Sequence, residues 1–364
     1  MDNNLNDIVV VNIDIAQPAV DSASFDNLLI VGLPPVAPPP KPLPDVGVYS
    51  DLSEVVAAGY AAVGENADAV GIAARIAFSQ NPKPSKIFIA AQKETGSTAL
   101  EPVTATLDRA LNTTGWYVVC PAGIPETDYA SIAEWTEAQT KMFAYTFLAT
   151  EDPVGSIFFR SQGWCGLEND NDSPTDVPEA NAYLHVAAVA KCLSYPSGAE
   201  TWAFKQLAGV YPSNFSGILK KIFMDEHSNY FAQYAGRKIT MNGQVRAGEW
   251  IDVIRGRDWL QNDMRLRIFN LLLMNPKIAY TDNGIALVQN EMIASLKSAQ
   301  ARGIVAENEY DEDGNLVPGF RVSVPKSQSL TATQKASRIL TECKFSARLA
   351  GAIHAVGVNG ALTY

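Results

Sequence analysis

The stretch Trp250-Ile-Asp-Val-Ile-Arg-Gly-Arg-Asp-Trp-Leu260 sets three charged side chains among large apolar ones. The charges belong to Arg255, Arg257 and Asp258. Charged groups beside buried aromatic residues must be paired with other charges or used in chemistry. The stretch therefore predicts either an active site or a strand–turn–helix junction that ion pairs hold together.

Two amphipathic helices are predicted directly after this stretch. The first covers residues 260–274, and the second begins at the capping sequence Thr281–Gly284 and ends at Gly303. Apolar residues recur in both at the spacing of a buried helix face. These residues are Leu260, Met264, Ile268, Leu271 and Leu272 in the first helix, and Ile285, Val288, Met292 and Leu296 in the second.

Upstream of the stretch, strand-like and helix-like segments alternate. The predicted strands cover residues 25–31, 86–91, 116–120, 141–148 and 156–159. The predicted helices cover residues 52–62, 67–79, 103–111, 127–139 and 178–193. Strands separated by segments of helical length favour a parallel sheet with crossover helices. We therefore expect an α/β sheet domain that is followed by an α+β domain.

The remaining segments give weaker signals. Residues 34–44 hold seven prolines and predict an extended surface loop. Residues 216–234 have a helical pattern, and residues 237–245 predict a hairpin that turns at Asn242-Gly243. The turn sequence at 311–314 is expected to lead into a strand at 319–324, and a basic helical stretch follows at 331–338.

Both extremes of the chain are β-prone, at residues 8–15 and 345–364. Strand backbone has polar groups that need partners. Either segment can add to a sheet of its own domain, or it can add to the sheet of a neighbouring subunit.

Composition restricts the class of protein. Apolar residues make up 47% and charged residues 18% of the 364 residues, which is typical of a globular chain with a large core. The net charge of −11 argues against a general nucleic-acid binder. No apolar run approaches the roughly 20 residues of a membrane helix. The first residues lack the pattern of a signal peptide, so we expect synthesis and use in the cytosol.

Charge is distributed unevenly along the chain. Residues 320–364 hold six basic residues and one acidic residue, which leaves +5, so residues 1–319 carry −16. The basic part is expected either to be a solvated face or to dock an acidic partner.

Motifs for catalysis are missing from the sequence. It has no P-loop, no GxSxG elbow and no dinucleotide-binding glycine turn. His185, His227 and His354 do not share a metal-binding spacing, and the four cysteines are too dispersed for a zinc site. We predict no catalytic, metal-binding or cofactor-binding residues, and no cofactor. An α/β enzyme with a site near Gly32 and Cys120 remains the alternative, on fold analogy alone.

The opening stretch, followed by Asn275-Pro-Lys-Ile-Ala-Tyr-Thr-Asp-Asn-Gly-Ile285, resembles the C-terminal half of bacteriophage contractile tail sheath proteins. It is most similar to their short, compact branch. Other segments agree in order and spacing, namely Tyr49–Glu54, Ala73–Gln80, Pro84–Ile89, Phe204–Gly209 and Leu349–Ile353.

This resemblance implies a structural role and no enzyme activity. Sheath subunits stack as hexameric rings around a tail tube and contract to drive the tube through the host cell envelope. The implied partners are further copies of the chain, the tail tube protein, and baseplate and tail terminator proteins, with no nucleic acid and no membrane insertion. The implied location is the virion tail, after assembly in the host cytoplasm.

The resemblance also implies a domain plan. It predicts an N-terminal linking arm over residues 1–24, an outer α/β domain over 25–199, an inner α+β domain over 200–350 and a C-terminal linking arm over 351–364. The N-terminal arm would bury Val9, Val11, Ile13 and Ile15 against a neighbour. A helix near 331–348 would face the tube with Lys335, Arg338 and Lys344.

Three hypotheses follow. The first is a sheath subunit, the second is a cytosolic α/β enzyme, and the third is another virion protein that shares the sheath domain. Under the first, Arg255, Arg257 and Asp258 form an ion-paired junction that leads into the helix at 260–274.

Overall fold

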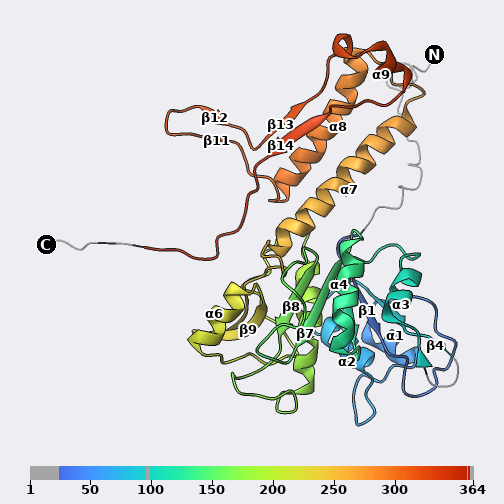
Figure 1. Cartoon of the computed structure of the whole chain (residues 1–364), viewed down its shortest axis with the longest axis vertical. Coiled ribbons are helices and arrows are strands. Elements are labelled where there is room, and N and C mark those ends of the chain that lie inside the picture. The colour runs from blue at the N-terminus through green and yellow to red at the C-terminus, as the bar shows by residue number, and fades with distance from the viewer. Residues whose placement is uncertain (1–23, 96–98, 359, 361–364) are drawn as a thin grey trace, which may run out of the picture.

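The computed structural model describes residues 24–95, 99–358 and 360. An α/β body is built on one mixed sheet, and a long helical hairpin projects from one end of it (Figure 1). The predicted strand at residues 8–15, with Val9, Val11, Ile13 and Ile15, lies outside the described residues.

The body contains an eight-stranded sheet in the order β10-β9-β8-β7-β6-β1-β3-β2. Its strands are β1 (Leu28–Gly32), β2 (Gly47–Tyr49), β3 (Ile87–Ala91), β6 (Val118–Ala122), β7 (Met142–Phe147), β8 (Ser161–Cys165), β9 (Asn229–Tyr234) and β10 (Arg237–Met241). The six inner strands run parallel, and the edge strands β2 and β10 are antiparallel to their neighbours. The predicted parallel sheet with crossover helices is confirmed.

Helices cover both faces of the sheet. The helices of one face are α1 (Leu52–Ala57), α2 (Ala69–Phe78) and α5 (Leu184–Leu193), the last preceded by a 3-10 turn at Glu179–Tyr183. Those of the other face are α3 (Val103–Ala110), α4 (Tyr129–Glu137) and α6 (Gly217–Asp225), with a 3-10 turn at Glu126–Asp128 before α4.

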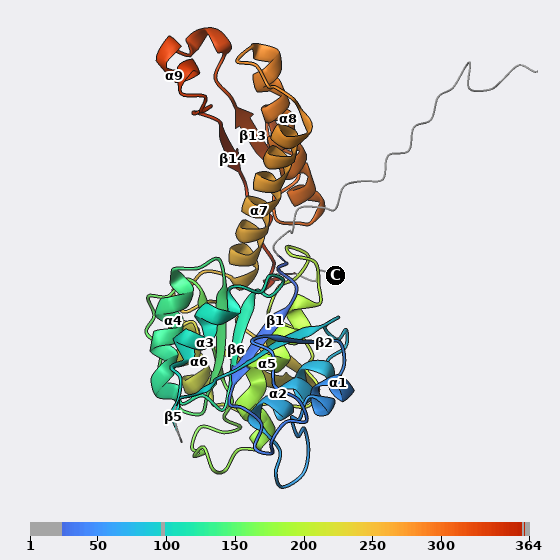
Figure 2. The same cartoon turned by 90° about the vertical axis from the view of Figure 1, so that its right-hand side faces the viewer.

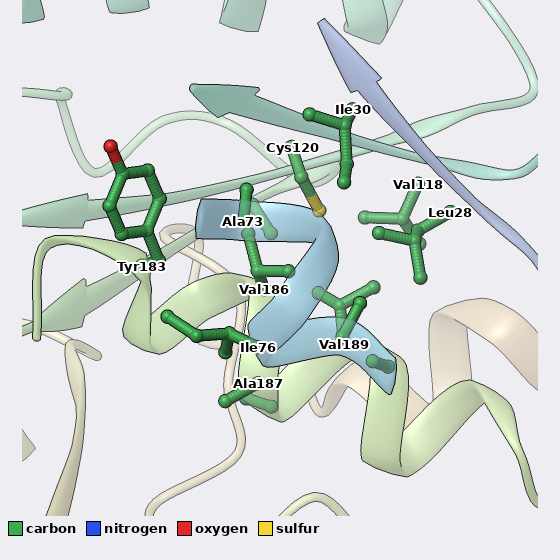
Figure 3. Close-up of a cluster of buried hydrophobic side chains, with 14 of the residues drawn as sticks. Leu28, Ile30, Ala73, Ile76, Val118, Cys120, Tyr183, Val186, Ala187 and Val189 are labelled. Atoms are coloured by element: carbon green, nitrogen blue, oxygen red, sulfur yellow. The ribbon is translucent and has the colours of Figure 1, made fainter. Parts of the chain in front are cut away.

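Two hydrophobic cores result, one on each face of the sheet. Alternate residues of a strand point to opposite faces, so Leu28 and Ile30 join the core under α2 and α5, while Leu29 and Val31 join the other. Figure 3 shows the first core, where Ile76 from α2 and Val189 from α5 face the strand residues.

The hairpin consists of α7 (Ile251–Met274) and α8 (Asp282–Ala301), which pack side by side (Figures 1 and 2). Smaller elements complete the chain. They are β4 (Glu94–Thr95), β5 (Ala99–Leu100), β11 (Glu309–Tyr310), β12 (Leu316–Val317), β13 (Phe320–Ser323), a 3-10 turn at Ser327–Ser329, α9 (Ala332–Ala336) and β14 (Lys344–Ala347). β13 and β14 form a two-stranded antiparallel sheet that lies against α8.

Several boundary signals in the sequence are confirmed. The side chain of Thr281 accepts a hydrogen bond from the backbone N–H of Gly284 and caps α8. Gly303 has a φ of 78°, the left-handed conformation expected after a helix. Of the described helices, none is long and apolar enough to span a membrane.

The predicted strand–turn–helix junction at residues 250–260 is wrong. Residues 251–260 are all helical, and Trp250 is the N-cap of α7. Gly256 lies inside the helix against Ile304, whose side chain would come within 3.1 Å of an added Cβ. A glycine at that position permits close packing and does not bend the chain.

The predicted long helix at 216–234 is also wrong. α6 ends at Asp225, His227 takes a φ of 58°, and residues 229–234 form β9. The next hairpin turns at Ala235-Gly236, where both residues have positive φ, and not at Asn242-Gly243. Pairing of β9 with β8 and β10 outweighs the local helical pattern, because it continues the sheet.

Two further expectations need correction. Residues 156–159 form no strand, and the strand begins instead at Ser161, in register with β7. The expected domain boundary at residue 199 falls inside the body, because β9 and β10 extend the same sheet. The sheet domain therefore continues to about residue 245, and the projecting domain begins with α7.

Candidate functional site

Arg255 holds the foot of α7 to the sheet domain. Its side chain is fully buried and donates to two carboxylates and four backbone carbonyls. The acceptors are the carboxylates of Asp26 and Glu200 at 2.8 and 2.5 Å, and the carbonyl oxygens of Phe25, Cys192, Leu193 and Tyr195 at 2.9–3.4 Å. Burial raises the pKa of Glu200, although Arg255 beside it acts in the opposite direction.

Asp258 makes a second buried attachment one turn further along α7. Arg160 donates to both of its carboxylate oxygens, at 2.7 and 3.0 Å, and the Tyr117 hydroxyl donates at 2.8 Å. Arg257, which is half exposed, donates at 3.1 Å. The ion pairing predicted for this stretch is confirmed, but Tyr117, Arg160 and Glu200 could not be identified as partners from sequence, since they lie 55 to 141 positions away.

These attachments lie at the amino ends of the parallel strands. Tyr117 directly precedes β6, and Arg160 directly precedes β8. Open α/β sheets bind ligands at the opposite edge, beyond the carboxyl ends of the strands. The charged stretch therefore holds the projecting domain to the body and does not form part of an α/β ligand site.

The carboxyl edge offers little support for the enzyme alternative. Cys120 is fully buried, and burial raises the pKa of its thiol well above the usual range. A Cβ on Gly32 would lie 2.4 Å from the carbonyl oxygen of Ala122, so neighbouring atoms already fill the space beside this residue. His185 is buried between Thr146 and Pro121, and burial lowers its pKa to about 3. Among the described residues, no group of three His, Cys, Asp or Glu could hold a metal.

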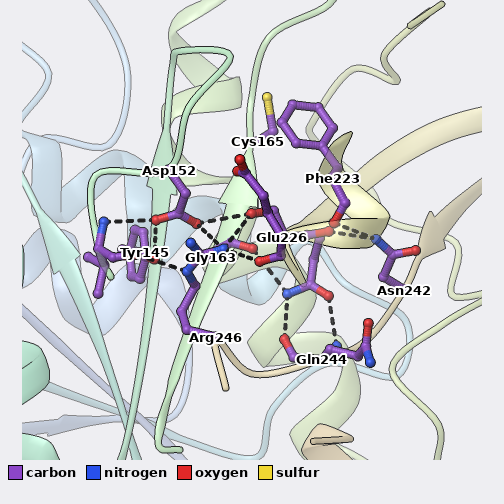
Figure 4. A network of polar contacts seen from close by, with 12 residues as sticks. Tyr145, Asp152, Gly163, Cys165, Phe223, Glu226, Asn242, Gln244 and Arg246 are labelled. Carbon is purple, nitrogen blue, oxygen red and sulfur yellow. Dashed lines mark hydrogen bonds and ion pairs between the residues drawn. The ribbon is translucent and has the colours of Figure 1, made fainter. Parts of the chain in front are cut away.

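A second buried polar network ties the loop after β7 to the segment between α6 and α7 (Figure 4). The Asp152 carboxylate accepts hydrogen bonds from Tyr145 at 2.5 Å and Ser228 at 3.2 Å, and it pairs with Arg246 at 3.3 Å. Arg246 also donates to Ser228 and to the carbonyl oxygen of Val154. Every charge here has a partner, so removing one partner would leave the other buried without a counter-charge.

The far end of α7 presents apolar side chains to solvent. Leu272, Leu273 and Met274 are 56%, 60% and 77% exposed, and Phe269 is 47% exposed. The predicted apolar face is only partly covered in the single chain. Leu260 and Met264 pack against the hydrophobic cluster of α8, Ile268 and Leu271 are partly buried, and Leu272 is exposed. We call the four exposed residues the hairpin face. Contiguous exposed apolar side chains mark interaction surfaces.

The β13–β14 pair offers edges for further strands. No third described strand pairs with either one. Downstream of β14, Val356 and Val358 are exposed. Strand edges with apolar extensions nearby are suited to pairing with another chain.

The expected helix near 331–348 is shorter than predicted. Only residues 332–336 are helical, in α9, where Lys335 is partly buried and its ammonium is 3.4 Å from the Ser327 hydroxyl. Arg338 is exposed just beyond the helix with a φ of 58°, and Lys344 is exposed at the start of β14. The change to strand follows from the antiparallel pairing of residues 344–347 with β13.

Comparison by sequence identifies the projecting domain. Residues 251–361 match a family described as E217 tail sheath protein gp31-like, C-terminal domain. The match begins at the first residue of α7, which agrees with the domain boundary in the structure. No curated protein matches the chain in sequence.

Comparison by structure extends the similarity to the whole chain. The anti-feeding prophage baseplate structure contains a chain with a TM-score of 0.70 and 13% identity, over 98% of this chain and 99% of that one. The contracted helical sheath of the same prophage gives 0.69 and 14%, over 97% and 98%. The contracted sheath of the extracellular contractile injection system PVC gives 0.68 and 10%, over 97% and 96%. The expected resemblance to contractile tail sheath proteins and the mixed α/β fold are confirmed.

Proposed function

We propose that this chain, which has the fold of contractile sheath proteins and a tail sheath C-terminal domain, is the repeating structural subunit of a contractile tail sheath. It stacks as hexameric rings around a tail tube and contracts to drive the tube through a cell envelope. The single observation that supports this best is the match of residues 251–361 to the sheath family, within a chain that aligns to sheath subunits over nearly its full length.

The hairpin face supports self-association. Leu272, Leu273, Met274 and Phe269 are exposed at the tip of a rigid helical hairpin that the Arg255 and Asp258 attachments hold to the body. In a repeating assembly such a face is buried against another copy of the chain. The same assembly would meet a baseplate at one end and a tail terminator protein at the other.

Strand exchange is the proposed link between subunits. The N-terminal arm, residues 1–24, would present Val9, Val11, Ile13 and Ile15, and the C-terminal arm would come from residues 351–364. The β13–β14 pair is the proposed acceptor, because no third described strand pairs with it and its only further pairing is the bridge between Val305 and Leu349 just beyond β14. Strand links of this kind would keep subunits joined while their bodies change orientation.

The basic stretch around α9 is the proposed contact with the tail tube. α9, which carries Lys335, lies at the end of the molecule furthest from the sheet domain (Figure 1), and Arg338 follows directly after it. Positive charge at this position suits an acidic tube surface.

The proposed energy source is a difference in contacts between assembly states. Larger buried contacts in the contracted state would drive the change without nucleotide hydrolysis. Assembly in the host cytoplasm and use in a virion tail, or in a phage-derived injection device, both fit this role. Stoichiometric ATP turnover coupled to contraction would contradict it.

Electron microscopy of the purified chain tests the proposal directly. At high protein concentration we expect tubes or stacked rings in negative stain. Deleting residues 1–20 should leave a folded monomer and abolish the tubes, whereas normal tubes from the deletion variant would rule out the arm. A ligand-dependent rise in Tm with a nucleotide or cofactor, in protein that forms no tubes, would favour the enzyme alternative.

A further inference from the structure

One histidine attaches the C-terminal segment to the sheet domain. The ring of His354 lies edge-on to Trp250, with centroids 4.5 Å apart, and edge-on to Phe204 at 5.6 Å. Its Nε2 is 2.7 Å from the Thr201 hydroxyl. We call the group formed by Thr201, Phe204 and Trp250 the His354 notch.

The rest of this segment makes little contact with the body. Ile353 is 81% exposed and Val356 is 77% exposed. Among residues 351–358, only His354 is not classed as exposed. An added Cβ would meet nothing within 4 Å at Gly351 or Gly357. Within residues 351–358, His354 is therefore the side chain that contacts the body, and the residues around it are exposed.

Contacts within the body hold the residues of the notch in position. Phe204 has a φ of 61°, a left-handed conformation that is strained for a non-glycine residue. Its backbone N–H donates to the Thr240 carbonyl at 2.8 Å, which fixes the backbone that carries the ring. Trp250 is the N-cap of α7, and Thr201 follows Glu200, the partner of Arg255. Two residues of the notch, Thr201 and Trp250, therefore adjoin the two segments that the Glu200–Arg255 ion pair joins.

We propose that His354 is a positioning residue that anchors the C-terminal arm in this notch, so that the part pairing with a neighbouring subunit begins at Ala355. This inference rests on the proposed sheath function and shortens the expected arm of residues 351–364. When His354 is docked, the position from which the arm leaves the subunit is fixed, so fewer conformations of the arm compete with pairing. A subunit whose arm is seldom docked would assemble more weakly, in proportion to the docked fraction.

The protonation state of His354 provides a second readout. Burial lowers the pKa of His354, and the nearby charge of Lys205 lowers it further. The docked form therefore holds the neutral ring. Docking is fully favoured above the ordinary histidine pKa of about 6.5, and it weakens as pH falls through the lower pKa of the docked ring.

Nuclear magnetic resonance of the monomer tests the docking itself. With labelled histidine, the chain gives ring signals from His185, His227 and His354, and the variant His354→Ala assigns the third. We expect the ring current of Trp250 to displace the chemical shifts of the His354 ring, and the pKa of His354 to lie below the ordinary histidine value. Both effects should disappear in Trp250→Ala. His185 is the internal reference. Undisplaced signals with an ordinary pKa in the wild type would overturn the proposal.

Assembly tests the positioning role. His354→Ala should raise the protein concentration at which tubes form about tenfold, because one hydrogen bond and edge-on ring contacts are together worth about that factor. His354→Phe, which retains the ring, should recover part of the loss. Ile353→Ala is the matched control and should assemble like the wild type, since the pairing part begins after it.

Two results would contradict this role. Tubes from His354→Ala at the wild-type concentration would overturn it, and so would an equal defect in Ile353→Ala. If wild-type protein forms no tubes, the sheath function and the assembly role of His354 fail together, while the monomer spectra still decide whether His354 occupies the notch.

Discussion

The carboxylate of Glu200 accepts a 2.5 Å hydrogen bond from Arg255, and both side chains are completely buried. This contact joins the second turn of α7 to the loop that follows α5, 55 positions earlier in the chain. It fixes the helix that carries the hairpin face to the sheet domain. Ile251 and Ile254 of the same helix add apolar contacts with the core of the sheet domain.

Arg255→Ala should lower the free energy of unfolding by about 3 to 5 kcal/mol, because it leaves Glu200 buried without a counter-charge. Urea unfolding followed by circular dichroism measures the change. Arg348→Ala is the control. It breaks the exposed pair with Glu309 and should cost no more than about 1 kcal/mol. Equal losses in the two variants would show that the buried pair has no special role.

Asp252→Asn should stabilise the protein at alkaline pH. Burial, with smaller contributions from Glu200 and Glu249, raises the pKa of Asp252 to about 6. Because the folded pKa exceeds the unfolded one, the stability contributed by protonated Asp252 is complete below pH about 4 and is lost as pH rises through 6. Urea titrations should show the variant more stable by on the order of 2 kcal/mol at pH 8 and equal to the wild type near pH 4.

The control for this effect is Asp311→Asn, because hydrogen bonds from the Asn315 backbone lower the pKa of Asp311. That substitution should not stabilise the protein at pH 8. A gain of equal size there would assign the effect to net charge instead of to the buried position.

Gly163→Ala should disrupt the network of Figure 4. An added Cβ would lie 2.0 Å from the Asp152 carboxylate and 2.8 Å from the Tyr145 hydroxyl. We expect a loss of about 2 to 3 kcal/mol in unfolding free energy. Gly155→Ala, where nothing lies within 4 Å, should change it by less than about 0.5 kcal/mol. Similar Tm values for both variants would show that the loop can move away at little cost.

Leu273→Glu should block assembly without weakening the monomer. The side chain is 60% exposed in the single chain, so unfolding free energy should change by less than about 0.5 kcal/mol. In the proposed sheath the same position is buried between subunits, where an unpaired charge is costly. Sedimentation and microscopy measure tube formation. Asn290→Glu, an exposed position on α8, is the matched control. Normal tubes from Leu273→Glu would exclude the hairpin face from the interface.

Reversing Lys335 and Arg338 to Glu should weaken co-assembly with the tail tube. The positive charge proposed to face an acidic tube is replaced by negative charge. Co-sedimentation with tube protein at low and high salt measures the effect, which should diminish as salt screens it. The same reversal at Lys220 and Lys221 on α6 controls for total charge. Unchanged co-assembly would reject the α9 region as the tube contact.

The amino-acid pattern predicted most of the central sheet and its helices. Local periodicity was sufficient there, because each inner strand is buried on both faces and each helix packs against the sheet. It failed at residues 229–234, where a helix-like pattern forms β9 because β8 and β10 supply partners on both sides. It also failed at residues 250–260, where a strand–turn–helix junction was expected and residues 251–260 belong to one helix.

The candidate surfaces were only partly predictable. The stripe from Leu260 to Leu272 indicated an apolar helix face, but its spacing did not show that its far end lacks cover within one chain. The run Phe269-Asn-Leu-Leu-Leu-Met274 has Asn270 as its one polar residue, and this excess of apolar residues was the available signal. His354 had no recognisable signal, because its notch combines residues about 100 and 150 positions away.

By itself, the sequence determined the alternation of strands and helices, the ends of α8 at Thr281 and Gly303, and the presence of charges that need partners in the Trp250–Leu260 stretch. These depend on periodicity and local backbone chemistry. Only the tertiary structure decided that Arg255 meets Glu200, that Asp258 meets Arg160, and that residues 251–274 form one continuous helix. Partners of buried charges are set by which segments the sheet brings together, and that long-range choice leaves no local trace in the sequence.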